Sequence, residues 1–148
     1  MYSPLSHAGW KGTVLGIAGQ TVRVMTEAYG CRPADIRAAI GPSIGGCCYE
    51  VDGAVMEPLR RMMNAAGLSN AEERCFRSRP NGKHLLNLRE INRQLLEKAG
   101  ILPMHIEITD LCTSCNTDLF FSYRKEHGRT GRMAAWIGLD LTKGAEPR

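Results

Sequence analysis

This 148-residue chain lacks any long apolar run, and it also lacks the pattern of a secretory leader. No segment approaches the roughly 20 apolar residues that a membrane-spanning helix needs. Residues 1–6 carry no basic side chain, and the apolar stretch that follows is broken by Gly12, Gly16 and Gly19. We therefore expect a cytoplasmic protein with no membrane partner, whose six cysteines are free thiols rather than a disulfide framework.

The chain also lacks a strong excess of charge of either sign. It has 19 Lys and Arg residues against 15 Asp and Glu residues, and its formal net charge is +4. The basic residues are scattered, and the tightest group is Arg124 and Lys125 with Arg129 and Arg132. This distribution argues against a nucleic-acid partner. Composition otherwise fits an ordinary globular domain that is long enough to bury one core.

Apolar side chains recur at helical and strand spacings and predict an α/β fold. Gly30 is expected to end the first helix, Pro58 to delay or kink the second, and Asn87 to cap the third. The nearly continuous apolar run Met133 to Leu139 predicts a central strand buried on both faces. The predicted elements are helices over 12–29, 51–66 and 87–99, strands over 36–40, 105–109 and 133–139, a polar excursion over 67–83, and a tail over 140–148.

The run His7-Ala8-Gly9-Trp10-Lys11-Gly12 is the first candidate for chemistry. A histidine that follows a strand and precedes a glycine-flanked turn and a helix is well placed to bind a metal ion. A catalytic zinc needs three protein ligands, so His7 would require partners. The alternative is an exposed histidine without a partner, and Trp10 is expected in the core or a lid rather than stacked on a base.

Glycines and cysteines mark two further candidate segments. The loop 41–46, which contains Gly45, is expected either to offer backbone N–H groups to a phosphate or to be a tight turn. Cys112 and Cys115 have metal-ligand spacing, but as a single pair they are only weak evidence for a zinc-ribbon or redox site. The adjacent Cys47 and Cys48 are expected to point in different directions as small buried residues.

Four segments together, in this order and at this spacing, resemble the laccase-domain family, also called multicopper polyphenol oxidoreductases. Members of that family are regarded as zinc-dependent purine nucleoside phosphorylases with adenosine deaminase activity. The resemblance runs from residue 7 to about 139. The segments are His7-Ala8-Gly9-Trp10-Lys11-Gly12, Gly41-Pro42-Ser43-Ile44-Gly45-Gly46-Cys47-Cys48-Tyr49-Glu50-Val51, Leu86-Asn87-Leu88 with Asn92-Arg93, and Cys112-Thr113-Ser114-Cys115-Asn116 through Phe120-Phe121-Ser122-Tyr123-Arg124 to Thr130-Gly131-Arg132-Met133.

The resemblance implies a layered α/β sandwich with the active site at the ends of buried strands. It also implies a zinc site made by a histidine of a Gln-Val-His segment, a cysteine of an Asp-Cys segment and His7. Only His7, as metal ligand and catalytic residue, has a counterpart here. Residues 1–139 therefore look like the C-terminal portion of one domain whose N-terminal half is missing. Copper is a less favoured metal than zinc.

The substrates that the resemblance implies are a purine nucleoside and phosphate. Arg124 and Arg132, with Ser122 and Tyr123 beside them, are candidates for holding phosphate, because guanidinium groups match its geometry. The loop of Gly45 is a further candidate contact. The alternative for the arginines is a solvated basic face.

We expect phosphorolysis of adenosine, inosine and methylthioadenosine, and deamination of adenosine, with both activities impaired by the truncation. A laccase-like polyphenol oxidase and an amidase that edits peptidoglycan precursors are alternatives within the same family. A non-catalytic fragment or pseudoenzyme is the alternative from another class. A homo-oligomer, or a partner chain that supplies the missing half, is the expected assembly.

Overall fold

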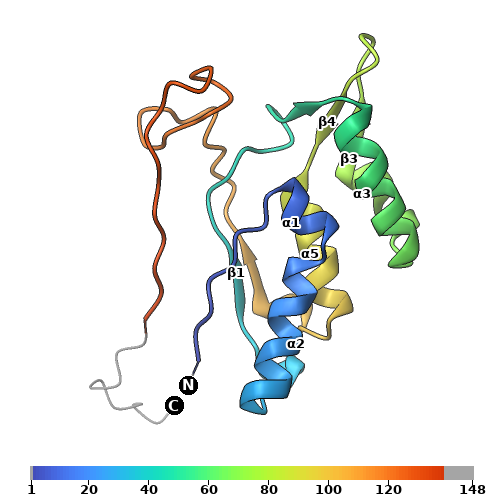
Figure 1. The fold of residues 1–148 in the computed structure, drawn as a ribbon, viewed down its shortest axis with the longest axis vertical. Coiled ribbons are helices and arrows are strands. Elements are labelled where there is room, and N and C mark those ends of the chain that lie inside the picture. The colour runs from blue at the N-terminus through green and yellow to red at the C-terminus, as the bar shows by residue number, and fades with distance from the viewer. Residues whose placement is uncertain (1, 139–148) are drawn as a thin grey trace.

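The computed structural model describes residues 2–138. Helices and strands alternate along the chain, which confirms the α/β class, and the strands form two small sheets. Figure 1 shows the helices gathered on one side of the molecule. The elements are α1 (Trp10–Val14), α2 (Ile17–Tyr29), η1 (Pro33–Asp35), β1 (Ala38–Ile40), β2 (Glu50–Val51), α3 (Gly53–Ala65), η2 (Ser69–Ala71), α4 (Glu72–Cys75), β3 (Phe76–Ser78), β4 (His84–Leu86), α5 (Leu88–Lys98), η3 (Pro103–His105) and β5 (Ile106–Ile108).

The first sheet is a parallel pair formed by β1 and β5, which are distant in sequence. Val22, Ile36 and Ile101 form a small buried cluster, against which Ala38 of β1 and Ile106 of β5 pack. Because the strands are parallel, the loops that follow them leave the sheet at the same edge. These loops, 41–49 and 109–116, carry Gly45 and the cysteines at positions 47, 48, 112 and 115.

The second sheet is antiparallel, with the strand order β2-β4-β3. The main core lies between this sheet and the helices α3 and α5, where Leu59, Leu86 and Ile91 are completely buried. Trp10 of α1 packs against the same core, as expected for a core tryptophan. The segment that carries His7 is therefore attached to the larger of the two cores.

Local signals in the sequence placed several helix ends correctly. Gly30 ends α2 in the left-handed conformation, with a φ of 66°. The side chain of Asn87 caps α5 by accepting a hydrogen bond of 3.3 Å from the backbone N–H of Glu90. The helix expected over 12–29 is instead split into α1 and α2, because Gly16 adopts a φ of 70° between them.

Pro58 does not prevent α3 from forming. The helix begins at Gly53, where the side chain of Asp52 accepts a hydrogen bond from Ala54, and it continues through Pro58. The expected polar excursion over 67–83 was too simple, since it contains η2, α4 and β3. Ala71, Cys75 and Phe76 are buried in the main core, and this burial holds the segment in place.

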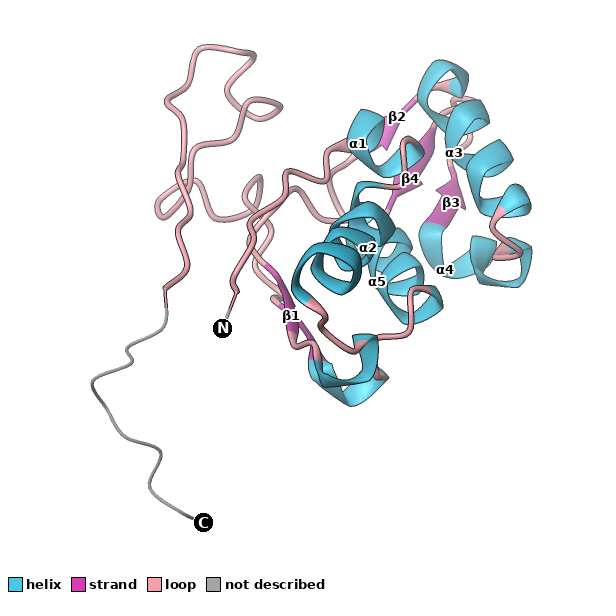
Figure 2. Ribbon diagram, turned by 60° about the horizontal axis from the view of Figure 1, so that its bottom comes forward, coloured by secondary structure: helices cyan, strands magenta, loops and turns pink. Residues whose placement is uncertain are grey.

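The prediction of a central strand over Met133–Leu139 was wrong for the residues that the structure describes. Residues 131–138 form no helix or strand (Figure 2), and each of them is exposed. A buried strand needs neighbours that bond its N–H and C=O groups, and no described strand pairs with this segment. Leu139 and the expected tail over 140–148 lie outside the described residues. Within the described part of the chain, no helix is both long and apolar enough to cross a membrane.

The two tryptophans give this segment a direct test. Trp136 is 83% exposed, whereas Trp10 packs against the core. We expect acrylamide to quench two populations, with nearly all of the strongly quenched fluorescence lost in Trp136→Phe. The weakly quenched population should disappear in Trp10→Phe. If Trp136→Phe removes mainly shielded fluorescence, the segment is covered in solution, and the exposed arrangement does not hold.

Candidate functional site

His7 lies in an extended segment that leads into α1, and its side chain is exposed. The backbone conformation of the segment from His7 to Gly12 depends on its glycines. A Cβ atom at Gly9 would lie 2.9 Å from Nε2 of His7, and one at Gly12 would lie 2.9 Å from its carbonyl oxygen. Glycine is required for steric reasons at position 12, where the close atom belongs to the backbone, whereas the exposed side chain of His7 could move away from a Cβ atom at position 9.

A buried chain of hydrogen bonds anchors this segment to α5. Nδ2 of Asn92 donates to Oγ1 of Thr13 at 3.0 Å, and Oγ1 of Thr13 donates to the carbonyl oxygen of Ala8 at 3.3 Å. Thr13 is fully buried, and Asn92 is 5% exposed. The residue next to His7 is therefore held by side chains of two helices.

The metal that the family resemblance implies does not have a complete site around His7 in the described residues. No two other His, Cys, Asp or Glu side chains of residues 2–138 join His7 in a group of metal-binding size. A catalytic zinc is typically bound by three protein ligands. The described residues around His7 therefore do not by themselves fit the ion.

The loop 41–49 packs tightly at the carboxyl ends of β1 and β5. Thr113 N donates to Ser43 O at 3.1 Å, which extends the parallel pairing beyond the strands. Gly45 is buried, and a Cβ atom there would lie 2.7 Å from Nη2 of Arg89. Arg89 also donates from Nη1 to the carbonyl oxygen of Thr109. Sequence reasoning did not single out Arg89, the arginine that lies against this loop.

Of the four residues near the C-terminus that are predicted to bind substrate, three are exposed and one, Ser122, is buried. The guanidinium of Arg124 donates to the carbonyl oxygen of Glu50 and lies 5.1 Å from the ring centroid of Tyr49. Arg132 is exposed and bonds only to the neighbouring Gly131 among the described residues.

Ser122 is buried, whereas Tyr123 is 68% exposed. The Ser122 hydroxyl accepts a hydrogen bond from Lys125 N, and its backbone N–H donates to a carboxylate oxygen of Glu126 at 2.7 Å. Ser122 therefore shapes its turn, while Tyr123 and the two arginines face solvent. Three other arginines, Arg74, Arg77 and Arg89, line a hollow of about 410 Å³ beside the loop 41–49.

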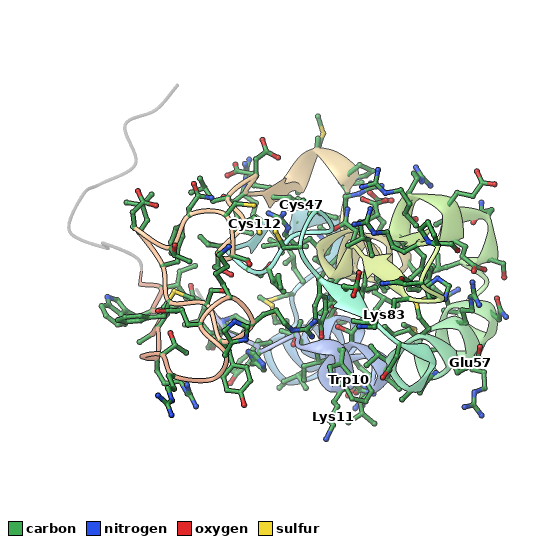
Figure 3. All side chains as sticks on the ribbon, turned by 90° about the horizontal axis from the view of Figure 1, so that it is seen from above. Trp10, Lys11, Cys47, Glu57, Lys83 and Cys112 are labelled. Atoms are coloured by element: carbon green, nitrogen blue, oxygen red, sulfur yellow. The ribbon has the colours of Figure 1, made fainter. Side chains whose placement is uncertain are left out.

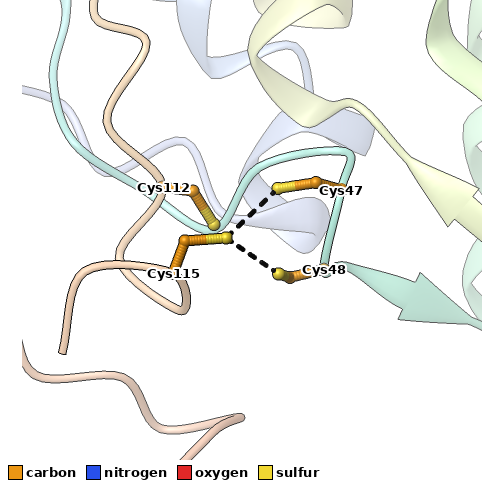
Figure 4. Close-up of side chains that lie close together, drawn as sticks. All are labelled: Cys47, Cys48, Cys112 and Cys115. Carbon is orange, nitrogen blue, oxygen red and sulfur yellow. Dashed lines mark hydrogen bonds between the residues drawn. The ribbon is translucent and has the colours of Figure 1, made fainter.

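Four cysteines lie close together at the carboxyl ends of β1 and β5, in the loops 41–49 and 109–116. They are the clearest cluster of potential metal ligands among the described residues. The Sγ atoms of Cys47, Cys48, Cys112 and Cys115 all lie within 4.8 Å of one another, so the group can hold a metal ion. Figure 3 shows Cys47 and Cys112 approaching each other from different segments. Figure 4 shows Cys115 facing both Cys47 and Cys48.

This arrangement corrects the expectation that Cys47 and Cys48 are small buried residues pointing apart. Cys47 is exposed, Cys48 is partly buried, and their Sγ atoms lie 3.7 Å and 3.4 Å from Sγ of Cys115. The second pair that the Cys112-x-x-Cys115 spacing lacked is Cys47-Cys48. The backbone folds Cys47 and Cys48 to the same side, because the N–H groups of Cys48 and Tyr49 both bond to Gly45 O.

The pKa values of Cys112 and Cys115 are shifted in opposite directions. Burial opposes ionisation of Cys112, but backbone hydrogen bonds from Gly45, Cys115 and Ser114 outweigh it and lower its pKa to about 6. Hydrogen bonds with the Cys48, Cys47 and Cys112 side chains raise the pKa of Cys115 to about 12.

Replacing Gly45 by alanine tests this packing. The new Cβ atom would lie 3.2 Å from Sγ of Cys47 and 3.3 Å from Cβ of Cys112, besides the close approach to Arg89. We expect the free energy of unfolding to fall by about 1–3 kcal/mol, because overpacking displaces the loop. Gly41→Ala is the matched control, since nothing lies within 4 Å of a Cβ atom there. Equal urea midpoints for the two variants would contradict the predicted clash.

The match to a sequence model of the multi-copper polyphenol oxidoreductase laccase family extends over residues 4–140. The purine nucleoside phosphorylase YlmD of Geobacillus stearothermophilus is 44% identical over 134 residues, which cover 90% of this chain and 47% of that protein. The human purine nucleoside phosphorylase LACC1 is 34% identical, over 91% of this chain and 30% of that protein. The chain thus spans about half the length, or less, of these curated relatives.

Solved structures agree with the sequence comparison. The crystal structure of the Bacillus licheniformis hypothetical protein YfiH gives a TM-score of 0.77 at 48% identity, over 85% of this chain and 45% of that one. The crystal structure of YlmD from Geobacillus stearothermophilus gives 0.73 at 39% identity, with the same coverage. The chain belongs to the multi-copper polyphenol oxidoreductase laccase family.

Proposed function

We propose that this chain forms one side of the active site of a purine nucleoside phosphorylase. The observation that carries the proposal is the 44% identity over 134 residues to a relative with that name. The His7 motif and the loops at the carboxyl ends of β1 and β5 lie within the matched region. Ligands of α/β sheets bind at such strand ends.

The proposed reaction is phosphorolysis of adenosine, inosine or methylthioadenosine. An oxygen of phosphate forms a bond to C1′ of the sugar, and the bond from C1′ to the purine nitrogen breaks. The electron pair of that bond stays on the purine, which takes up a proton, so the products are the free base and a sugar 1-phosphate. Deamination of adenosine, with water replacing the amino group as ammonia leaves, is proposed as a second activity.

Zinc is the proposed metal of this reaction, and His7 is its proposed ligand from this chain. When bound, zinc would supply Lewis-acid chemistry. The further ligands lie outside the described residues. Copper would be the metal of the alternative function, a polyphenol oxidase. The chimera assay described below tests that alternative with a phenolic substrate.

Arg124 and Arg132 are proposed to contact phosphate, with the loop of Gly45 as a further phosphate contact and Tyr123 lining the same pocket. Arg124 suits this role because its hydrogen bond to Glu50 and its position over Tyr49 fix the guanidinium while leaving it exposed. Ser122 is proposed to act through the turn that it stabilises.

A partner, either another chain or another segment, is proposed to cover the apolar residues near the C-terminus. Leu119, Phe121, Trp136 and Ile137 are each at least half exposed, and exposed apolar patches mark interaction sites. A cytoplasmic location is proposed as well, in keeping with six cysteines that are free in the structure.

The experiment is a chimera in which this chain replaces the matched region of the Geobacillus stearothermophilus relative. We expect the chimera to release hypoxanthine from inosine only when phosphate is present, and ammonia from adenosine. The unaltered relative is the positive control, and this chain alone is expected to release no base. A folded chimera without phosphate-dependent release would contradict the proposal. Turnover of a peptidoglycan precursor amide or of a phenol would instead favour the amidase or the oxidase.

A further inference from the structure

The four cysteines come from two loops that the fold brings together independently of any metal. Cys47 and Cys48 follow β1, and Cys112 and Cys115 follow β5. The β1–β5 pairing continues past the strands, where Thr109 N donates to Ile40 O at 3.1 Å and Ser43 pairs with Cys112. The backbone therefore fixes the distance between the loops before the thiols interact.

The separations of the sulfur atoms match those of a tetrahedral metal site. Zinc–sulfur bonds are about 2.3 Å long, so the edge of the tetrahedron of sulfur atoms is about 3.8 Å. Sγ of Cys115 lies 3.4 Å from Sγ of Cys48 and 3.7 Å from Sγ of Cys47. Because all four Sγ atoms lie within 4.8 Å of one another, movements of less than about 1 Å would complete the tetrahedron.

The surroundings favour thiolates. The backbone N–H of Gly45 donates to Sγ of Cys112 at 3.2 Å, and the Cys112–Cys115 turn is closed by Cys115 N and Asn116 N donating to Cys112 O. The guanidinium of Arg89 packs against Gly45. A divalent ion with four thiolates carries a net charge of −2, and the Gly45 N–H and the nearby cation stabilise that charge.

We propose that Cys47, Cys48, Cys112 and Cys115 form a tetrathiolate site for a soft divalent metal ion, with zinc as its occupant. On binding, each thiol releases its proton to solvent, and the sulfur donates an electron pair to the metal. The ion enters from the surface, since Cys47 and Cys115 are exposed. The role is structural: the metal clamps the loop 41–49 to the loop 109–116 at the edge where the family's substrate contacts are expected.

The site is independent of the proposed enzymatic function, because His7 is not in the cluster. A single histidine binds a divalent ion weakly compared with four thiolates, so this chain is expected to hold zinc whether or not it contributes to a phosphorylase. Failure of the nucleoside assay would therefore leave this inference standing, and failure of the metal assay would leave the nucleoside assay standing.

The test is metal analysis of the 148-residue chain, purified under reducing conditions without chelators. We expect about one zinc ion per chain and, after replacement by Co²⁺, the sulfur-to-metal charge-transfer absorption of a tetrahedral thiolate site. Cys115→Ser and Cys48→Ser should each weaken zinc binding at least about 100-fold in a competition titration. Both residues are outside the main core, so these variants are expected to fold.

Two controls make the result decisive. Cys31→Ser, which removes a cysteine remote from the cluster, and His7→Ala should both retain the metal and the cobalt spectrum. Circular dichroism confirms the folding of every variant. Retention of zinc in Cys115→Ser, a cobalt spectrum without sulfur bands, or a disulfide between Cys115 and Cys47 or Cys48 in place of bound metal would each overturn the proposal.

Discussion

Replacing Leu59 by alanine is expected to lower the free energy of unfolding by about 2–5 kcal/mol. Leu59 lies in α3, its side chain has no exposed surface, and it belongs to the cluster shared by α3, α5 and the antiparallel sheet. The deletion removes buried methyl groups and leaves a cavity that the neighbouring Met56 and Met63 fill only in part. Domains of this kind are stable by only about 5–15 kcal/mol, so the loss is a large fraction.

Urea unfolding followed by circular dichroism measures this change as a lower midpoint with an unchanged slope. Leu15→Ala is the matched control, because Leu15 is 78% exposed and its truncation should stay within about 0.5 kcal/mol. Similar midpoints for the two variants would show that α3 is not packed on the main core in solution.

Short-range signals in the sequence were sufficient for most helices. Gly30 and Asn87 ended and capped α2 and α5 as predicted, because these signals act through the backbone within one helical turn. Gly16 was misread, since helical spacing of apolar side chains continues across it and only the backbone conformation reveals the break.

Long-range pairing could not be obtained in the same way. Cys48 and Cys115 are 67 residues apart, and they meet only because β1 pairs with β5 in parallel, which no local pattern indicates. Arg89 reads as an ordinary residue of the first turn of α5 until the loop of Gly45 is placed against it. The sequence did contain a signal for the cluster, because it has two cysteine pairs, Cys47-Cys48 and Cys112/Cys115.

The apolar run from Met133 failed for a related reason. Its composition describes a strand covered on both faces, but an interior strand exists only with neighbours. The described residues supply none, and Met133 and Trp136 are exposed. The prediction was therefore wrong about the conformation of the described residues of this run.

His7→Ala is expected to lower phosphate-dependent base release by at least about 100-fold in the active chimera, because it removes a proposed metal ligand, an effect larger than that of outer-shell changes. Stability should change by no more than about 0.5 kcal/mol. The imidazole is exposed, and within residues 2–138 the segment is held instead by the hydrogen bonds from Asn92 to Thr13 and from Thr13 to the backbone of Ala8.

A substitution at Thr13 distinguishes the proposed metal ligand, His7, from a residue that only holds the His7 segment in place. Thr13→Val breaks the hydrogen-bond chain to Ala8 and should lower stability by about 1–3 kcal/mol, since Nδ2 of Asn92 keeps only its bond to Leu88 O. His84→Gln, in the β3–β4 hairpin, is the histidine control and should leave the rate unchanged. Initial rates of hypoxanthine release from inosine, measured beside thermal melts, give both readouts. Full activity in His7→Ala would rule out His7 as the proposed metal ligand and leave the cysteine cluster as the metal-binding candidate of the described residues.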